Sequence, residues 1–546
     1  MSTRPSARGA GALCAALVFV SVLPAQGSTT LRPLAQDRAK GAAAVTEAMC
    51  RDWLGTLASP EYGGRGTGQP GYELAAVYVR DHFQKLGLKP AFPEGSYWQA
   101  LPWNVTEPKA EGTHLRLTHG GKAVVDLGLA ELAGTATQEI EAKGDVVLVV
   151  VRDLEGNDLA GADLSDKIVL VHAPAGLVPK GQAGRRGNAA LFRLQSALQQ
   201  ARARLTVFCD DELFAATGKV QGASVPGGGG ANRAMRGRDR RPVSLTVKTS
   251  VLEKALAAAG KTLENVAAHA GLVDLAGLQA DVAVKVETRQ GPAYNVAAIL
   301  PGSDPARRDE YVVMGSHLDH LGQRGATLFP GADDDASGST GLMAVAAMWA
   351  RNPVKPARSL LFVAFTGEEM GLLGSNHFVE NPPIPLGSIV AELQMDMIGR
   401  DEEGQDESAD ANRNTLHLVG TERLSRSLHE LCLARNEQHF GFALEYDEED
   451  VFSRSDHANF ARKGIPIAFF FTGFHRDYHQ QSDTPDKIHY AKLLKVATYV
   501  YDLSFELAQA KGRPLVDPDL WEKSRKGLGR NVPEKPVAPL APAKGG

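Results

Sequence analysis

The sequence predicts an α/β fold, with a mixed, mostly parallel β-sheet lying between layers of helices. Apolar strand-like runs alternate with helical periods from Tyr294 to about Ala510, and this alternation is typical of parallel strands joined by helices. A helical period over 72–86 opens the folded part of the chain. The last helical run, 488–508, carries its apolar residues on one stripe, as packing on a sheet requires: Leu493, Val496, Val500, Leu503 and Leu507.

Length and composition exclude several classes of protein. A chain of 546 residues is too long for one ordinary core, so we expect two or three domains and tails. The net charge is −5 and the Lys and Arg residues are scattered, so neither nucleic acid nor a membrane surface is indicated as a partner. None of the 4 cysteines forms a Cys-x-x-Cys pair, so any metal has to be held by histidines and carboxylates.

The N-terminus has the features of an export signal. Arg4 and Arg8 precede an apolar run over 10–22, and small residues follow up to Gly27 at a spacing that signal peptidases accept. Because a membrane span needs roughly 20 apolar residues, we expect a cleaved signal over 1–27 and not a permanent anchor. The mature protein would then be periplasmic or extracellular, without stable membrane insertion.

Residues 111–286 differ in sequence pattern from the segments on either side, and this pattern predicts an inserted β-rich module. Short β runs at 145–151 and 167–172 precede a helical run at 190–203 and a further short strand. The four glycines from Gly227 to Gly230 predict a mobile loop.

The rest of the chain divides around this insert. Residues 45–110 and 287–511 would form one catalytic domain, with a linker over 28–44 before it and a disordered, Pro- and Lys-rich tail over 512–546 after it. The glycine-rich stretch Tyr62–Gly68 lacks the preceding strand and the Gly-Lys-Ser/Thr of a phosphate-binding loop, so we expect a flexible surface loop there.

Potential metal ligands follow four of the predicted strands. The strands at 311–314, 359–365, 389–395 and 465–471 lead respectively to His317 and Asp319, to Glu368 and Glu369, to Asp396, and to His475 and His479. Because the carboxyl ends of strands in an open α/β sheet line the ligand crevice, these groups are expected to converge although they lie far apart in the sequence.

An acidic loop, Asp333-Asp334-Asp335, precedes a predicted helix that begins near Ala336. Three adjacent carboxylates repel one another unless cations lie among them, although the helix N-terminus offers partial positive charge. Taken singly, these groups could be a hydrogen-bonded turn, a helix cap or a surface acidic pair. Their joint occurrence favours a metal site, and mixed His and carboxylate ligands suit zinc.

Six motifs then appear in the order in which one enzyme family carries them: Ser316-His317-Leu318-Asp319, Gly331 to Gly338, Thr366-Gly367-Glu368-Glu369, Asp396-Met397-Ile398-Gly399, Ser455-Asp456-His457, and Tyr478-His479 followed by Asp483-Thr484. With them the chain resembles the di-zinc exopeptidases of clan MH, which include secreted bacterial aminopeptidases and glutamate carboxypeptidase II. The resemblance covers roughly 53–103 and 294–510 and implies a phosphorylase/hydrolase-like α/β fold. The insert resembles the protease-associated domain of secreted peptidases.

The resemblance implies two zinc ions per chain. His317 and Asp396 would bind one ion, Glu369 and His479 would bind the other, and Asp334 would bridge both.

The resemblance also implies roles for residues that do not bind zinc. Glu368 would be the general base and Asp319 would orient His317, and Asp483 would orient His479 in the same way. A strained, cis peptide between Asp334 and Asp335 is suggested by the family. His475 is a rival of His479 as a ligand, and His320 is expected to be a neighbour of the site.

The predicted function is hydrolysis of a peptide at one end of its chain, with the amino end favoured. A carboxypeptidase stays open because Arg400, Arg454, Arg462 and Arg476 could bind a terminal carboxylate. A single-zinc glutaminyl cyclase and a binding protein that has lost catalysis stay open as well. Three consecutive residues, Ser455-Asp456-His457, cannot form a hydrolase triad. Residue preference and oligomeric state stay open.

Overall fold

A computed structural model describes residues 31–151, 159, 161–173, 193–226, 244–268, 270–324, 327–404, 408–446, 451–529 and 532–540. The predicted signal peptide and the predicted loop at 227–230 lie outside these residues. Of the helical run expected at 190–203, residues 193–200 are described and helical.

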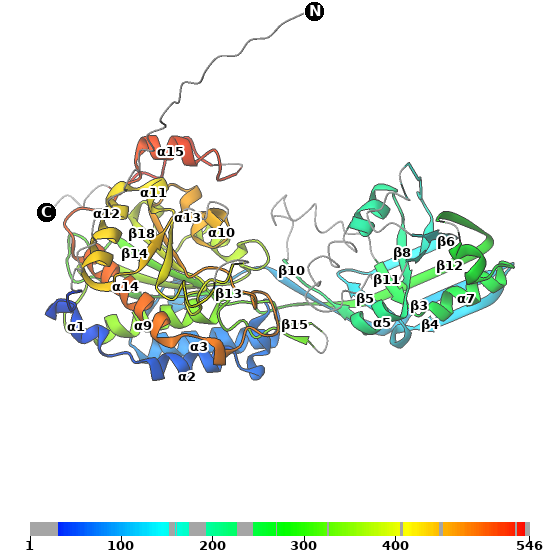
Figure 1. The fold of residues 1–546 in the computed structure, drawn as a ribbon, viewed down its shortest axis with the longest axis horizontal. Helices are drawn as coiled ribbons and strands as arrows, with labels where there is room; N and C mark the ends of the chain where they lie inside the picture. The colour runs from blue at the N-terminus through cyan, green and yellow to red at the C-terminus, as the bar shows by residue number, and fades with distance from the viewer. Residues whose placement is uncertain are drawn as a thin grey trace, which may run out of the picture.

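A nine-stranded mixed sheet forms the centre of the larger lobe (Figure 1). Its four middle strands are parallel neighbours, in the order β17 (Ser359–Phe365), β14 (Tyr311–His317), β18 (Ile389–Met395) and β21 (Ile467–Phe471). Antiparallel pairing begins on either side, at β13 (Tyr294–Leu300), which pairs with β1 (Lys89–Pro90) and β2 (Trp98–Ala100), and at β19 (Thr415–Val419), whose outer neighbour is β20 (Ala443–Glu445). The predicted α/β fold is confirmed.

Helices cover both faces of this sheet, and each layer has its own apolar core. One face packs against α3 (Pro70–Lys85), α9 (Ala336–Arg351) and α14 (Tyr490–Gln509), and α2 (Glu47–Leu57) packs on α9 and α14. The other packs against α10 (Leu373–Glu380) and α13 (His457–Arg462). In the described part of the chain, no helix is both long enough and apolar enough to cross a membrane.

Helix α9 is buried on all sides from Ala336 to Trp349. One face of α9 packs against β14, β17 and β18. The opposite face is buried too, because α2, α14 and a short helix, α1 (Gln36–Ala42), pack against it. Gly338 and Gly341 let α9 approach the end of β18 closely, since a Cβ atom at Gly338 would lie 2.4 Å from the Met395 carbonyl oxygen.

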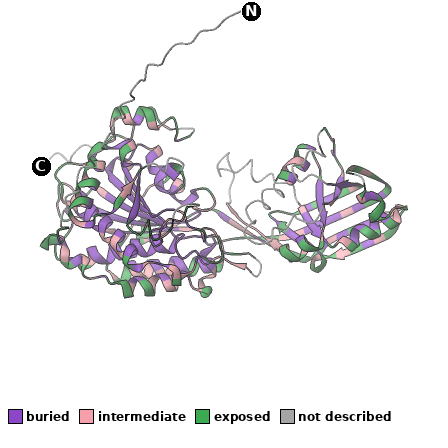
Figure 2. Cartoon of the chain, in the orientation of Figure 1, coloured by how far each residue is buried: buried purple, intermediate pink, exposed green. Residues whose placement is uncertain are grey.

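A second, ten-stranded sheet forms the smaller lobe, between Trp103 and Gln290 (Figure 1). Two long antiparallel strands, β3 (Trp103–His119) and β12 (Gly271–Gln290), run out from the larger lobe as a ribbon. The remaining strands are β4 (Lys122–Gly128), β5 (Ala133–Ala136), β6 (Ile140–Val150), β7 (Ile168–His172), β8 (Leu205–Cys209), β9 (Val220–Gly222), β10 (Ser224–Pro226) and β11 (Ser244–Val247). The described helices of this lobe include α5 (Asp211–Thr217), α7 (Thr249–Ala258) and α8 (Leu263–Ala267), beside the helical residues 193–200. Figure 2 shows that this lobe has its own buried interior.

The C-terminal tail differs from the predicted disordered segment 512–546. Helix α15 (Pro518–Ser524) lies in it and packs against α11 (Thr421–Leu424). The Trp521 side chain is buried, and its Nε1 donates to the Glu534 carbonyl oxygen at 3.0 Å. One buried aromatic ring therefore anchors a segment whose average composition indicates disorder.

The predicted linker over 28–44 is also partly structured. Arg38, on α1, is buried and its Nη1 lies 2.8 Å from Asp502 Oδ1 on α14. The folded domain therefore begins before residue 45.

The tail predicts a stability effect. We expect Trp521→Ala to lower the free energy of unfolding by about 3–5 kcal/mol, because the substitution removes a large buried ring. Leu515→Ala is the matched control, because that side chain in the same tail is 53% exposed. Equal thermal denaturation midpoints for the two variants would show that the tail is not part of the folded domain.

Candidate metal centre

Side chains from four strand ends meet at the carboxyl edge of the central parallel strands. His317 is the last residue of β14, Asp396 follows β18, the Glu368-Glu369 pair follows β17, and His479 lies in the loop after β21. Together with Asp334, from the loop before α9, they form two adjoining groups. The structure thus brings together all five side chains that the resemblance implies as ligands.

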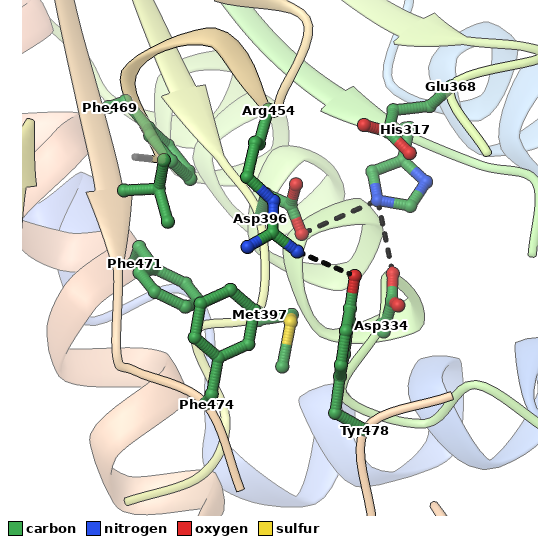
Figure 3. Close-up of a pocket in the computed structure, with 11 residues that line it drawn as sticks. His317, Asp334, Glu368, Asp396, Met397, Arg454, Phe469, Phe471, Phe474 and Tyr478 are labelled. Atoms are coloured by element: carbon green, nitrogen blue, oxygen red, sulfur yellow. Dashed lines mark hydrogen bonds and ion pairs between the residues drawn. The ribbon is translucent and has the colours of Figure 1, made fainter. Parts of the chain in front are cut away.

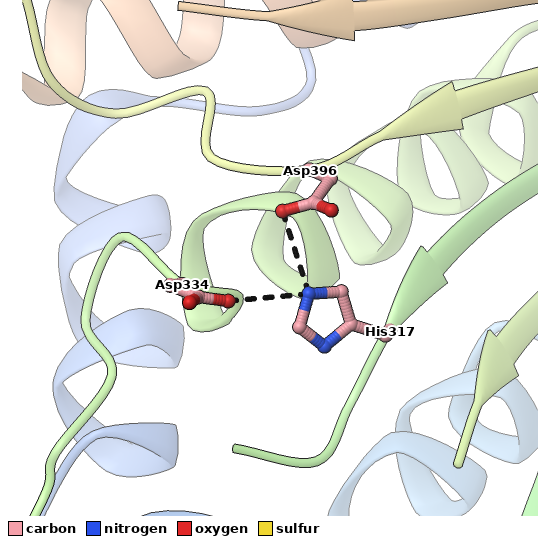
Figure 4. Close-up of side chains that lie close together, drawn as sticks. All are labelled: His317, Asp334 and Asp396. Carbon is pink, nitrogen blue, oxygen red and sulfur yellow. Dashed lines mark ion pairs between the residues drawn. The ribbon is translucent and has the colours of Figure 1, made fainter. Parts of the chain in front are cut away.

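The first group consists of His317, Asp334 and Asp396 (Figure 4). His317 Nε2 lies 3.2 Å from Asp334 Oδ1 and 3.4 Å from Asp396 Oδ1. All three side chains are buried. The other ring nitrogen, Nδ1, lies 3.0 Å from the Asp319 carbonyl oxygen, which leaves Nε2 to face the carboxylates.

The second group uses the other oxygen of Asp334. His479 Nε2 lies 3.0 Å from Asp334 Oδ2 and 3.2 Å from Glu369 Oε2. His320 belongs to this group as well, with Nδ1 2.7 Å from Glu369 Oε1. Because the two carboxylate oxygens of Asp334 face different groups, this one side chain joins them.

The three adjacent carboxylates of the acidic loop point in different directions. Asp335 caps α9 by accepting from the Gly338 N–H at 2.8 Å, and it also accepts from the N–H groups of His317 and Met397. The Asp334–Asp335 peptide is cis, as the resemblance suggested. Asp335 is therefore a structural acceptor for the ends of two strands, and Asp334 is left to face the histidines.

Asp333 has a separate partner in His475. Its Oδ1 accepts from the Gly399 N–H at 2.7 Å, and its Oδ2 lies 3.3 Å from His475 Nε2. The His475 side chain is therefore engaged away from the second group, where His479 lies.

The structure places the carboxylates of Asp319 and Asp483 differently from the sequence prediction. The Asp319 carboxylate accepts from the Thr67 hydroxyl at 2.9 Å and from the Glu368 N–H at 3.1 Å, while its carbonyl oxygen contacts His317. The Asp483 carboxylate accepts from the N–H groups of Asp333 and Asp334. Asp483 thus orients the acidic loop and not His479, because its side chain points toward that backbone.

The two adjacent glutamates, Glu368 and Glu369, have pKa values shifted in opposite directions. Burial raises the pKa of Glu368 well above its usual value, and the neighbouring carboxylate of Glu369 adds to this rise. Burial also acts to raise the pKa of Glu369, but the contacts with His320 and His479 outweigh it and hold this pKa at about 2. Two neighbouring groups with opposite shifts are typical of an acid/base residue beside a permanently charged one.

A pocket opens beside the first group (Figure 3). Its walls are apolar on one side, formed by Met397, Val451, Phe469, Phe471 and Phe474. Arg454 and Tyr478 also line it, with Arg454 Nη2 3.5 Å from the Tyr478 hydroxyl oxygen. The aromatic residues of this wall were not identified from the sequence, although the run of three phenylalanines at the end of β21, Phe469 to Phe471, is the signal that could have found them.

Of the four arginines that the sequence leaves open, only Arg454 lines this pocket. Arg400 contacts Asp477 at 3.2 Å, Arg462 donates to the Leu528 carbonyl oxygen, and Arg476 pairs with Glu403.

The Ser455-Asp456-His457 segment is buried beside the pocket. His457 Nε2 lies 3.0 Å from the Phe452 carbonyl oxygen, and its ring stacks on Phe469 with centroids 4.5 Å apart. These contacts support the apolar wall and do not form a catalytic relay.

A further cluster of Glu402, His417 and Glu445 lies away from this centre. His417 Nε2 lies 3.1 Å from Glu402, whereas Nδ1 lies 3.6 Å from Glu445. Because the two carboxylates face different nitrogens of one ring, we assign no metal to this cluster.

The buried His457 predicts an acid-dependent loss of stability. Burial lowers its pKa to about 3 in the folded protein, against about 6.5 for an unfolded histidine. Between these values the unfolded chain binds more protons, so stability falls with falling pH by up to about 1.4 kcal/mol per pH unit. We expect His457→Gln to reduce the slope of unfolding free energy between pH 4 and pH 6. An unchanged slope would contradict this assignment.

The fold and the centre together define a metal-dependent hydrolase, with two His and carboxylate groups joined by one aspartate and a further glutamate left beside them. Residues 295–504 match the model of peptidase family M28, and the match supports the same class, a metallopeptidase.

Curated and solved relatives are similar over different lengths. An aminopeptidase of Pseudomonas aeruginosa is 25% identical over 429 residues, which is 77% of this chain and 69% of that protein. Leupeptin-inactivating enzyme 1 of Streptomyces exfoliatus is 26% identical over 45% of this chain and 55% of its own length. The solved structure of an aminopeptidase from Aneurinibacillus sp. strain AM-1 aligns with a TM-score of 0.49 at 20% identity, covering 88% of this chain and 98% of that one.

Proposed function

We propose that the protein is an exported aminopeptidase that uses two zinc ions. The observation that carries this proposal is the position of Asp334, whose two oxygens face separate imidazole and carboxylate groups. A carboxylate so placed is suited to bridge two cations. The names of the curated relatives, among them an aminopeptidase of Pseudomonas aeruginosa, support the reaction class.

The donor set fits zinc. Each group offers imidazole nitrogen and carboxylate oxygen, which zinc accepts, and the buried carboxylates need cations to offset the cost of their burial. His317 and Asp396 would hold one ion, Glu369 and His479 the other, and Asp334 both. When bound, the ions supply Lewis-acid chemistry, polarising the scissile carbonyl and making water a better nucleophile.

Glu368 is the proposed general base. It lines the pocket, is not needed as a ligand, and has a pKa raised above its usual value, which favours a role in proton transfer. It would take a proton from the attacking water and pass it to the nitrogen of the leaving amine. His320, whose Nδ1 lies beside Glu369 Oε1, would orient that carboxylate so that it can act as a ligand.

The charge of the pocket favours attack at the amino end of a peptide. Asp334 and Asp396 are assigned to zinc, whereas Glu368 also lines the pocket and is not used as a ligand, so its carboxylate is the one available to attract a free α-amine. One observation favours a carboxypeptidase as the second candidate: the cation Arg454 lines the same pocket. A glutaminyl cyclase with one zinc would leave half of the ligand set unused.

Two further features belong to this proposal. Export is supported by the sequence of residues 1–27, and N-terminal sequencing of protein from the culture medium tests it. We propose that the smaller lobe is an insert of the protease-associated type. The segments of chain before and after it would together form one catalytic domain. Replacing the lobe by a short linker and comparing turnover of long and short peptides tests whether it selects substrate size.

The role of Glu368 predicts a selective loss of turnover. We expect Glu368→Gln to lower kcat by about 10²–10⁴-fold, because it removes the proton acceptor, while zinc content stays at the wild-type level. Glu380→Gln, at an exposed glutamate paired with Lys463, is the control. Full activity of Glu368→Gln with both ions bound would refute the general-base assignment.

The direction of attack predicts a substrate difference. We expect the protein to release the first residue from a peptide with a free amine and to leave the N-acetylated form of the same peptide intact. Chromatography of the released amino acids measures this. Release of the last residue from the acetylated peptide would establish the carboxypeptidase instead.

A further inference from the structure

The glycine-rich stretch Tyr62–Gly68, which the sequence predicts to be a flexible surface loop, is largely buried. Residues 64–67 are buried and Arg65 is completely inaccessible. This segment lies next to the loops of the metal centre but supplies none of the proposed ligands. A charged side chain at 0% exposure is costly unless all its donors are satisfied, so its contacts indicate what it does.

The Arg65 guanidinium joins the loops that carry two of the proposed ligands. Nε donates to the carbonyl oxygen of Leu318, next to His317, at 2.9 Å. Nη1 and Nη2 donate to the carbonyl oxygens of Pro330 and Gly331, at the start of the acidic loop, at 2.8 and 2.7 Å. A further bond, from Nη1 to the Leu57 carbonyl oxygen, fixes the group to the end of α2. All four acceptors are backbone carbonyl oxygens.

The backbone around Arg65 adds to the same connection. The Arg65 carbonyl oxygen accepts from the His320 N–H at 3.2 Å, and the Gly64 carbonyl oxygen accepts from the Gly322 N–H at 3.0 Å. Gly64 has φ +66°, and a Cβ atom there would lie 2.1 Å from the Phe329 carbonyl oxygen. The segment is therefore in close contact with the loop that runs from His317 to the acidic run.

Thr67 extends the connection to the proposed base. Its hydroxyl donates to Asp319 Oδ2 at 2.9 Å, and Asp319 Oδ1 accepts from the Glu368 N–H at 3.1 Å. Residues 64–67 thus reach the loops of His317, Asp334 and Glu368 from one side.

Charge supports the same interpretation. The Arg65 guanidinium is fully buried in the field of four carboxylates: Asp335, Asp334, Asp483 and Asp319. It is a fixed cation that offsets their repulsion whether or not the ligand positions are filled.

We propose that residues 64–67 form a brace that fixes the loop of His317 against the loop of Asp334, with Arg65 as a positioning residue for metal binding and Thr67 as a positioning residue for Glu368. This inference rests on the proposed two-zinc site. A lysine at position 65 would keep the charge but could not hold the carbonyl groups of three segments at once, because it lacks the planar fork of donors.

The test is zinc affinity, measured without substrate by competition with a chelator. We expect Arg65→Lys to weaken binding at one or both positions by about tenfold or more, as the loss of groups that orient ligands typically does. Arg358→Lys is the matched control. Arg358 is also buried and binds carbonyl oxygens, those of Leu507, Ala510 and Gly512, but it lies at the opposite, amino end of β17. It should lower the denaturation midpoint and change zinc affinity less than about twofold, since it touches no ligand loop.

Each outcome has a distinct meaning. If the wild type binds no zinc, the proposed function fails. If the wild type binds two ions and Arg65→Lys binds them equally well, the brace is wrong and the proposed function stands.

Thr67 provides a second measurement if Arg65→Lys does not fold. We expect Thr67→Val to keep zinc affinity and KM but to lower kcat at least about tenfold, because the loss of its bond to Asp319 disturbs the position of the proposed proton acceptor. Thr67→Ser keeps the hydroxyl and should restore kcat. Wild-type kcat in Thr67→Val would overturn the Thr67 part of the inference, and with it the link to Glu368.

Discussion

The burial of three consecutive carboxylates is the constraint on which the rest of the larger lobe depends. Each of them needs its own partners, because adjacent negative charges removed from water destabilise the fold unless each is compensated. Asp333 is compensated by the Gly399 N–H and His475, Asp335 by three N–H groups, and Asp334 by the two ligand groups. These partners come from the ends of different strands, so satisfying the loop also draws the strand ends together.

The sequence predicted the elements that carry the centre because two simple signals act together there. Apolar periodicity marks the strands, and polar residues follow where the strands end, as at His317 and Asp396. The carboxyl-edge rule then brings them into one crevice. These signals indicate the place of the site, whereas the choice of Asp334 among three aspartates and of His479 over His475 came from the resemblance to the di-zinc exopeptidases. The run of phenylalanines from Phe469 to Phe471 could have indicated the pocket wall.

Other parts were not predictable, for physical reasons. Spacing does not tell whether His317 is oriented by the carboxylate of Asp319 or by its carbonyl oxygen, since both lie within reach of the ring. Asp483 follows His479 closely in sequence, yet its side chain binds the backbone of the acidic loop. The tail was misjudged because composition averages over many residues, whereas Trp521 alone supplies a large buried surface. The glycine-rich stretch was misjudged because glycine indicates both freedom and close approach.

The way the smaller lobe is attached has a mechanical consequence. The ribbon of β3 and β12 begins at Trp103, whose side chain is buried with Leu373 and would lie 3.6 Å from a Cβ atom at Gly367, the residue before Glu368. The end of the ribbon at the larger lobe therefore contacts the turn that bears the proposed base, Glu368. The indole ring of Trp103 thus couples the base of the ribbon, and with it the attachment of the smaller lobe, to the backbone next to Glu368.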